Sequence, residues 1–108
     1  MAANPSFMSG VPELLVLRLL QDREMYGYEI VAAVAAATGQ VVAPKEGVIY
    51  PLLHDLEKEG LLKSRRKTVG GRSRIYYSLT ARGAKRLSAM TDHWSALTGA
   101  VGAVLHAV

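Results

Sequence analysis

Basic side chains crowd into one stretch of this chain, and their number and spacing suit binding to a polyanion. Residues 61–86 contain nine lysines and arginines and no acidic residue, whereas residues 1–60 have a net charge of −4. A local charge of +9 is typical of a surface that meets nucleic acid. A solvated basic face, or one that pairs with the acidic N-terminal half, stays open as an alternative. The nine residues are Lys63, Arg65, Arg66, Lys67, Arg72, Arg74, Arg82, Lys85 and Arg86.

Other kinds of chemistry find little support in the residue types. The chain has no cysteine, which excludes a disulfide framework and a thiolate metal site. It has no Ser-His-Asp pattern, no phosphate-binding loop and no acid pair on an evident pocket, so we expect a protein that is not an enzyme. His54 and His93 each stand beside an aspartate, which leaves a metal-responsive regulator as the weaker alternative. We predict no metal site and no cofactor.

Length and composition favour one folded domain. The chain has 108 residues, half of them apolar, and a net charge of only +4, which does not suit a disordered segment. The longest nearly uncharged stretch, residues 94–108, is shorter than the roughly 20 residues that cross a membrane. The first ten residues lack the basic start of a secretory signal. We therefore expect a cytoplasmic protein with no membrane partner.

Two helices are expected near the N-terminus. Pro12 suits the first turn of a helix over residues 12–20, which is apolar on nearly all sides. Such a helix is either central in the core or covered by a second chain. A second helix, residues 26–38, places apolar side chains at helical spacing and is followed by Gly39, a residue that commonly ends helices.

A third helix is predicted from residues 46–48 to Glu59, with Gly60 as its C-terminal stop. Pro51 is tolerated only near the first turn, so the helix cannot begin much earlier. Its spacing turns one apolar side inward and leaves a polar side facing out. The inward residues are Ile49, Leu52, Leu53 and Leu56.

A β-hairpin follows, with strands over residues 61–68 and 74–79 and a turn over residues 69–73. Gly70-Gly71 is a hairpin signal, because both residues can adopt positive φ. In the second strand Ile75, Tyr77 and Leu79 share one face, and Arg74, Tyr76 and Ser78 share the other. The hairpin is therefore expected to have an apolar inner face and a basic tip.

The last helix is expected to begin after Thr80, a good N-cap, and to continue to about His106. Its apolar residues alternate spacings of three and four, which is a heptad seam that needs a partner surface. We predict self-association through this seam, together with Leu14 and Leu15 of the first helix; a helix folded back on its own core is the alternative. The seam consists of Leu87, Met90, Trp94, Leu97, Val101, Val104 and Val108, and the dimer contacts are assigned to its first six residues.

Three helices followed by a basic hairpin predict a winged helix-turn-helix. The fold class is mainly α with a small β-hairpin, plus a long C-terminal dimerisation helix. Residues 1–10 are expected to be a flexible tail, residues 11–79 the DNA-binding domain and residues 80–108 the dimerisation helix.

Several short motifs together resemble the PadR family of bacterial transcriptional regulators, in the subfamily with a single C-terminal helix. The resemblance covers roughly residues 12–105. Many family members carry a hydroxyl residue and leucine where this chain has Val48-Ile49, which puts one phosphate or capping hydrogen bond in doubt. The motifs are Tyr26-Gly27-Tyr28-Glu29-Ile30, Gly47-Val48-Ile49-Tyr50-Pro51-Leu52-Leu53, Leu56-Glu57, Gly60-Leu61-Leu62, Gly71-Arg72-Ser73-Arg74 and Tyr76-Tyr77-Ser78-Leu79-Thr80 with Gly83.

The resemblance implies a homodimer that binds a pseudo-palindromic operator in double-stranded DNA and represses transcription. It places Gly47, Tyr50 and Pro51, with Lys45 just before them, in the major groove. It assigns the wing to Gly71, Arg72 and Arg74.

The residue roles follow as hypotheses. Phosphate contacts are expected from Lys45, Lys67, Arg72 and Arg74. Tyr50 and His54 project from the outer face of the third helix toward base edges, although Tyr50 packed against the wing and His54 simply facing solvent stay open. A winged-helix module that binds proteins is the competing function, and it would carry a neutral or mixed wing.

Trp94 has two interpretations. It packs in a dimer interface, or it forms a platform for a small apolar or aromatic effector, as the resemblance suggests. Such a site would be lined by Met8, Leu15, Met90 and Trp94.

Overall fold

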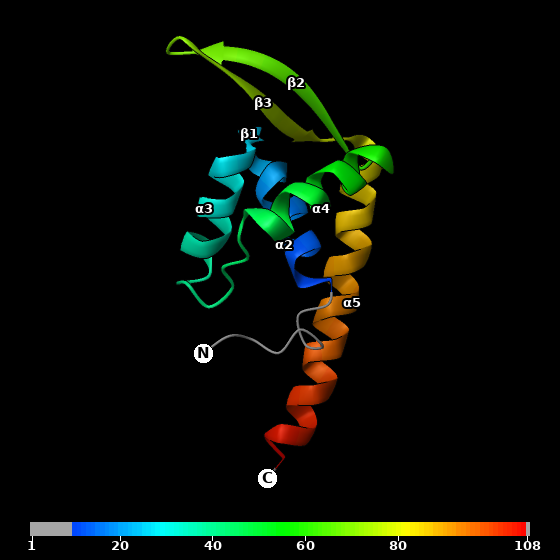
Figure 1. Ribbon diagram of the computed structural model, residues 1–108. Coiled ribbons are helices and arrows are strands. Elements are labelled where there is room, and N and C mark those ends of the chain that lie inside the picture. Colours follow the sequence, from blue (N-terminus) through cyan, green and yellow to red (C-terminus); the bar gives the residue numbers. More distant parts are fainter. Residues whose placement is uncertain (1–9, 108) are drawn as a thin grey trace.

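The computed structural model describes residues 10–107, and it has the mainly helical fold with a small β-hairpin that the sequence predicts (Figure 1). Its helices begin and end close to their expected bounds. The elements follow one another as α2 (Val11–Asp22), β1 (Met25–Tyr26), α3 (Gly27–Ala37), α4 (Glu46–Lys58), β2 (Leu62–Val69), β3 (Arg72–Leu79) and α5 (Ala81–Leu105).

The core lies where α2, α3 and α4 meet the inner face of the sheet. Each helix buries the side that its spacing predicts, because residues three and four apart share one face of a helix. Helix α2 is covered on more than one side: its Leu14, Leu15 and Leu19 are half-buried, whereas Arg18 is exposed. Among the described residues, the largest fully buried side chains are Val16, Leu17, Ile30, Val34, Ile49, Leu53, Leu56 and Leu62.

A short strand that the sequence does not reveal completes the sheet. Strand β1 pairs antiparallel with β3, so the order is β1-β3-β2. Tyr26 faces Tyr76 across this pair, and the two rings meet edge to face with centroids 5.5 Å apart. Tyr76 lies on the outer basic face, as predicted. Only 8% of its surface is exposed, because Tyr26 and Lys67 lie against its ring.

The hairpin turn is shorter than predicted. Strand β2 continues to Val69 and β3 already begins at Arg72, so Gly70 and Gly71 alone form the turn, in place of residues 69–73. Their φ angles are +59° and +78°, a region that favours glycine and matches the twist of a two-residue hairpin. Arg72 therefore belongs to the strand and lies opposite Val69.

Helix α5 is joined to the sheet by a tight connection. Thr80 caps the helix by accepting a hydrogen bond from the Gly83 amide at 3.0 Å, and its hydroxyl lies 2.7 Å from the Gly60 carbonyl oxygen. Gly83 is buried against the backbone of Leu61, where a side chain would collide. The predicted cap and start of the helix are therefore confirmed.

Most of α5 projects away from the body of the molecule (Figure 1). The radius of gyration is 15.3 Å, larger than the roughly 13 Å of a compact chain of this length. Leu87 packs in the core and Met90 against it, and nearly all later residues of the helix are exposed. Within the described residues, no helix is both long enough and apolar enough to traverse a bilayer.

Candidate nucleic-acid interface

Helix α4 presents a polar side outward, as its spacing predicts. Gly47, Tyr50, Pro51 and His54 lie three or four residues apart and are all exposed, and Lys45 is the exposed N-cap residue. Apart from its chain neighbours and the backbone of its own helix, no heavy atom of the described residues lies within 4 Å of the point where a side chain of Gly47 would begin. Because Pro51 has no N–H, the Gly47 carbonyl also lacks its usual intrahelical donor. The start of α4 is thus an open surface.

A groove of about 290 Å³ lies between this helix and the hairpin. Tyr50 and His54 of α4 line one side, and Arg74 and Ile75 of β3 line another. The Arg74 guanidinium carbon lies 4.3 Å from the centre of the Tyr26 ring, a cation–π distance. Three of the predicted contact residues, Tyr50, His54 and Arg74, therefore meet in one place, whereas Lys45 and Pro51 line other hollows. The remaining lining residues, which belong to the family motifs but were not among the predicted contact residues, are Tyr26, Gly27, Tyr28 and Tyr77.

Tyr77 forms part of the floor of this groove. It is 6% exposed, and burial raises the pKa of its phenol, with the Glu57 carboxylate adding to the effect. Glu57 also accepts a hydrogen bond from Ser64 of β2, which ties α4 to the hairpin. The floor of the groove is therefore uncharged at Tyr77, whereas the rim of the groove carries the charged side chain of Arg74.

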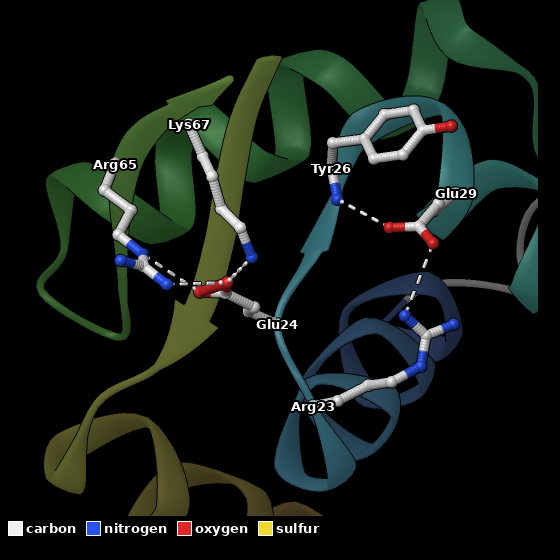
Figure 2. Close-up of polar contacts among 6 residues, drawn as sticks. All are labelled: Arg23, Glu24, Tyr26, Glu29, Arg65 and Lys67. Carbon is white, nitrogen blue, oxygen red and sulfur yellow. Dashed lines mark hydrogen bonds and ion pairs between the residues drawn. The ribbon is translucent and has the colours of Figure 1, made fainter. Parts of the chain in front are cut away.

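A second polar cluster holds the outer face of the hairpin to the segment before β1 (Figure 2). The Glu24 carboxylate accepts hydrogen bonds from Arg65 Nη2 at 2.8 Å and Lys67 Nζ at 2.9 Å. The hydrogen bonds from Arg65 and then Lys67 lower the pKa of Glu24 to about 2, from an ordinary value of 4.5. Lys67 Nζ also lies 4.6 Å from the centre of the Tyr76 ring. Lys67, a predicted phosphate contact, is thus already paired.

Glu29 organises the start of α3 beside this cluster. Figure 2 shows its carboxylate accepting a hydrogen bond from the Tyr26 amide at 3.2 Å and from Arg23 at 3.3 Å. Glu29 thereby satisfies an amide at the helix N-terminus, where a negative charge is also favoured by the helix dipole. These contacts fix the residues that line the groove from the α3 side.

The charge of the basic block is divided between paired and available groups. Three of its nine cations pair with carboxylates of the N-terminal half: Arg65 and Lys67 with Glu24, and Arg86 with Glu13. Pairing with the acidic half, one of the alternatives, therefore applies to these three. Within residues 10–107, no carboxylate lies within ion-pair distance of Arg72 or Arg74.

The predicted dimerisation residues that the structure describes fall into three groups by burial. Leu87 is 3% exposed and packs in the core of its own chain, so it has no surface left for a partner. Leu14, Leu15 and Met90 pack against that core and are half-buried. The exposed members are Trp94 at 43%, Leu97 at 49%, Val101 at 47% and Val104 at 78%.

Two other predictions concern ligands. Met8, one of the four predicted effector residues, lies outside the described residues, so the structure places only Leu15, Met90 and Trp94. Within the part of the chain that the structure describes, no three side chains of the types that ligate metals come together.

Comparisons with known proteins identify the family of this chain. The model of the transcriptional regulator PadR-like family matches residues 16–89. The transcriptional regulator Rv3488 of Mycobacterium tuberculosis is 34% identical over 82 residues, which are 76% of this chain and 74% of that protein. The transcriptional regulator YqjI of Escherichia coli is 35% identical over 81 residues, but these are 75% of this chain and only 38% of that longer protein.

Solved structures give the same family. A PadR-like transcriptional regulator from Bacillus cereus matches with a TM-score of 0.84 at 30% identity, over 95% of this chain and 99% of that chain. A PadR family regulator from Eggerthella lenta matches with a TM-score of 0.81 at 30% identity, over 95% and 88%. These relatives are regulators of transcription, which confirms the prediction that the chain is not an enzyme. The matched family model covers well over half of the sequence, and the chain belongs to the PadR-like family of transcriptional regulators.

Proposed function

We propose that this regulator is a homodimeric repressor that binds a pseudo-palindromic operator, with α4 in the major groove and the wing beside it. One observation carries the proposal: Tyr50 and His54 of α4 and Arg74 of β3 line the same groove. A helix that reads base edges and a wing that holds the backbone must act on one stretch of duplex, so their shared surface fits this role.

The start of α4 suits close approach to DNA. Gly47 adds no side chain there, and its surroundings are open. Lys45 stands at the N-terminus of the helix, where the helix dipole also favours a phosphate. In this proposal Tyr50 and His54, one and two turns further on, reach base edges. Pro51 is exposed as well, but it lines a separate hollow with Val48 and Asp55.

The wing supplies phosphate contacts from Arg72 and Arg74. Arg72 is exposed next to the turn, and Arg74 reaches toward the groove. Lys67 joins them only when a phosphate replaces Glu24 as its partner, so its share of the affinity is smaller than that of the two arginines. Each phosphate contact steepens the salt slope, which is the fall of log K with log salt concentration, by about 0.9.

The second copy of the chain covers the apolar side of α5. Trp94, Leu97, Val101 and Val104 form a stripe at heptad spacing that their own chain leaves exposed. Leu14, Leu15 and Met90 border this stripe and are half-buried. Two copies joined in this way present two α4 helices, which matches an operator with two-fold symmetry.

In this proposal, a small apolar or aromatic effector binds only to the dimer. Leu15 and Met90 are half-buried, and Trp94 is partly exposed, so a compound at this place needs the second chain as its other wall. The chain has a single tryptophan, and quenching of its fluorescence by planar compounds tests the site. An effector acts by binding better to one dimer geometry than to another.

DNA binding is tested with an operator that the wild-type protein selects from a random pool. Arg74→Gln should weaken binding and lower the salt slope by about 0.9 for each lost contact. Arg18→Gln is the matched control, because it removes the same charge from α2, where Arg18 pairs with Asp22. Equal losses in both variants, or equal affinity of the wild type for unrelated DNA, would contradict operator recognition.

Dimerisation is tested by sedimentation. The wild type should have a mass of about 23 kDa, twice the 11.6 kDa of the chain, and Leu97→Glu should shift it toward the monomer. Ser95→Glu places the same charge on the side of α5 away from the stripe and should leave the dimer intact. A wild-type monomer that still binds its operator would exclude this assembly.

A further inference from the structure

The ring of Tyr50 lies directly on the backbone of Gly27, the first residue of α3. If Gly27 had a β-carbon, that atom would overlap Cε1 of Tyr50 and lie 3.2 Å from its Cδ1 and Cζ. The three atoms nearest to this point all belong to the Tyr50 side chain. Gly27 therefore provides the seat on which the Tyr50 ring rests.

The backbone of Gly27 does not itself require glycine. Its φ lies outside the left-handed region, in contrast to Gly39, Gly70 and Gly71. Alanine is also the better helix former and suits the start of a helix. The three atoms that come nearest to a side chain at residue 27 all belong to the Tyr50 ring, so the lack of a side chain there is tied to the position of this ring.

We propose that Gly27 is a positioning residue for Tyr50 in DNA recognition, an inference that rests on the proposed function. With the Cε1 edge of its ring against Gly27, Tyr50 is 39% exposed and stands at the groove that His54 and Arg74 also line. Its hydroxyl can donate and accept a hydrogen bond, and the seat holds it at the rim, on the side where the duplex passes.

Seating the ring before DNA arrives lowers the entropy lost on binding. A free tyrosine at this position would have to be ordered at the moment of recognition. Ordering one such side chain corresponds to a loss of about 2- to 10-fold in affinity. Because Tyr50 is a side chain at the surface of α4, it can rotate away from an added methyl group without unfolding the protein.

The test is a double-mutant cycle with a labelled operator selected by the wild type. Gly27→Ala should keep or raise the melting temperature and weaken operator binding about 2- to 10-fold. In the Tyr50→Ala background the same change should have no effect on binding, because no ring remains to be displaced. The α-protons of Gly27 in the free wild type should show a ring-current shift that Tyr50→Ala removes.

Two outcomes would overturn the inference. One is an equal loss of affinity from Gly27→Ala in both backgrounds, which would indicate a backbone effect at the start of α3. The other is full operator affinity in Gly27→Ala. Failure of the proposed function looks different, since the wild type would then select no operator and Arg74→Gln would change nothing.

Discussion

The packing of Gly83 against Leu61 gives a prediction whose size can be worked out. Gly83 lies in the first turn of α5, and a β-carbon there would overlap the Leu61 carbonyl oxygen and lie 2.7 Å from Cδ1 of Leu79. The carbonyl cannot move away freely, because it accepts a hydrogen bond from the Thr80 amide at 3.1 Å. Gly83→Ala must therefore push apart the connection between sheet and helix.

The expected cost is the balance of three contributions. Overpacking costs about 1–3 kcal/mol, and weakening the hydrogen bond to Leu61 costs about 1 kcal/mol. Replacing glycine by alanine in a helix offsets up to about 1 kcal/mol of this. Gly83→Ala should therefore lower the free energy of unfolding by about 1–3 kcal/mol.

Gly47→Ala is the matched control. Gly47 also lies in the first turn of a helix, but its surroundings are open, so this change should be neutral or stabilising. Urea unfolding followed by far-ultraviolet circular dichroism measures both variants, at one protein concentration because dimerisation would couple to folding. A Gly83→Ala protein as stable as Gly47→Ala would refute the steric argument.

Three further changes test the rest of the structure. The stability difference between wild type and Glu24→Gln should be largest above pH 4.5 and should disappear as the pH falls toward 2, because a carboxylate with a lowered pKa stabilises the fold only while it is ionised. A stability difference that does not change with pH in urea titrations would contradict this. Leu53→Ala should lower the free energy of unfolding by about 2–5 kcal/mol, since Leu53 is fully buried, whereas Val41→Ala, at a residue 75% exposed, should cost little in the same assay. Gly71→Ala should cost about 1–2 kcal/mol because of its positive φ, and an unchanged urea midpoint would speak against the observed turn.

The helices could be predicted because their signals are local. In α4, residues three and four apart are apolar on one side, and Ile49, Leu53 and Leu56 are buried as that spacing requires. Thr80 and the Gly70-Gly71 pair likewise specify a cap and a turn through their own conformational preferences. Each of these features is decided by residues within one or two turns of chain.

The features that were missed depend on contacts between distant parts of the chain. Strand β1 has only two residues, too few for any alternation, and it exists because β3 offers hydrogen bonds to Met25 and Tyr26. Glu24 pairs with cations more than 40 residues later, a relation that no local pattern contains. The contact between Tyr50 and Gly27 also joins two helices, and the Tyr-Gly-Tyr motif around Gly27 indicates only that the segment matters.

The distribution of ion pairs bears on how far charge counting can predict a binding surface. Glu24 neutralises cations in the middle of the outer face of the wing, at Arg65 and Lys67. Arg72, next to the turn, and Arg74, at the groove, have no such partner within residues 10–107. Lys63 and Arg66 of β2 and Arg82 and Lys85 of α5 also lack a carboxylate partner within these residues, so the uncompensated charge extends along the hairpin to the start of α5. At the turn and beside α4, a phosphate can therefore meet a cation without first displacing a carboxylate. The sequence gives the sum of charges, but only the fold decides which of them a polyanion can use.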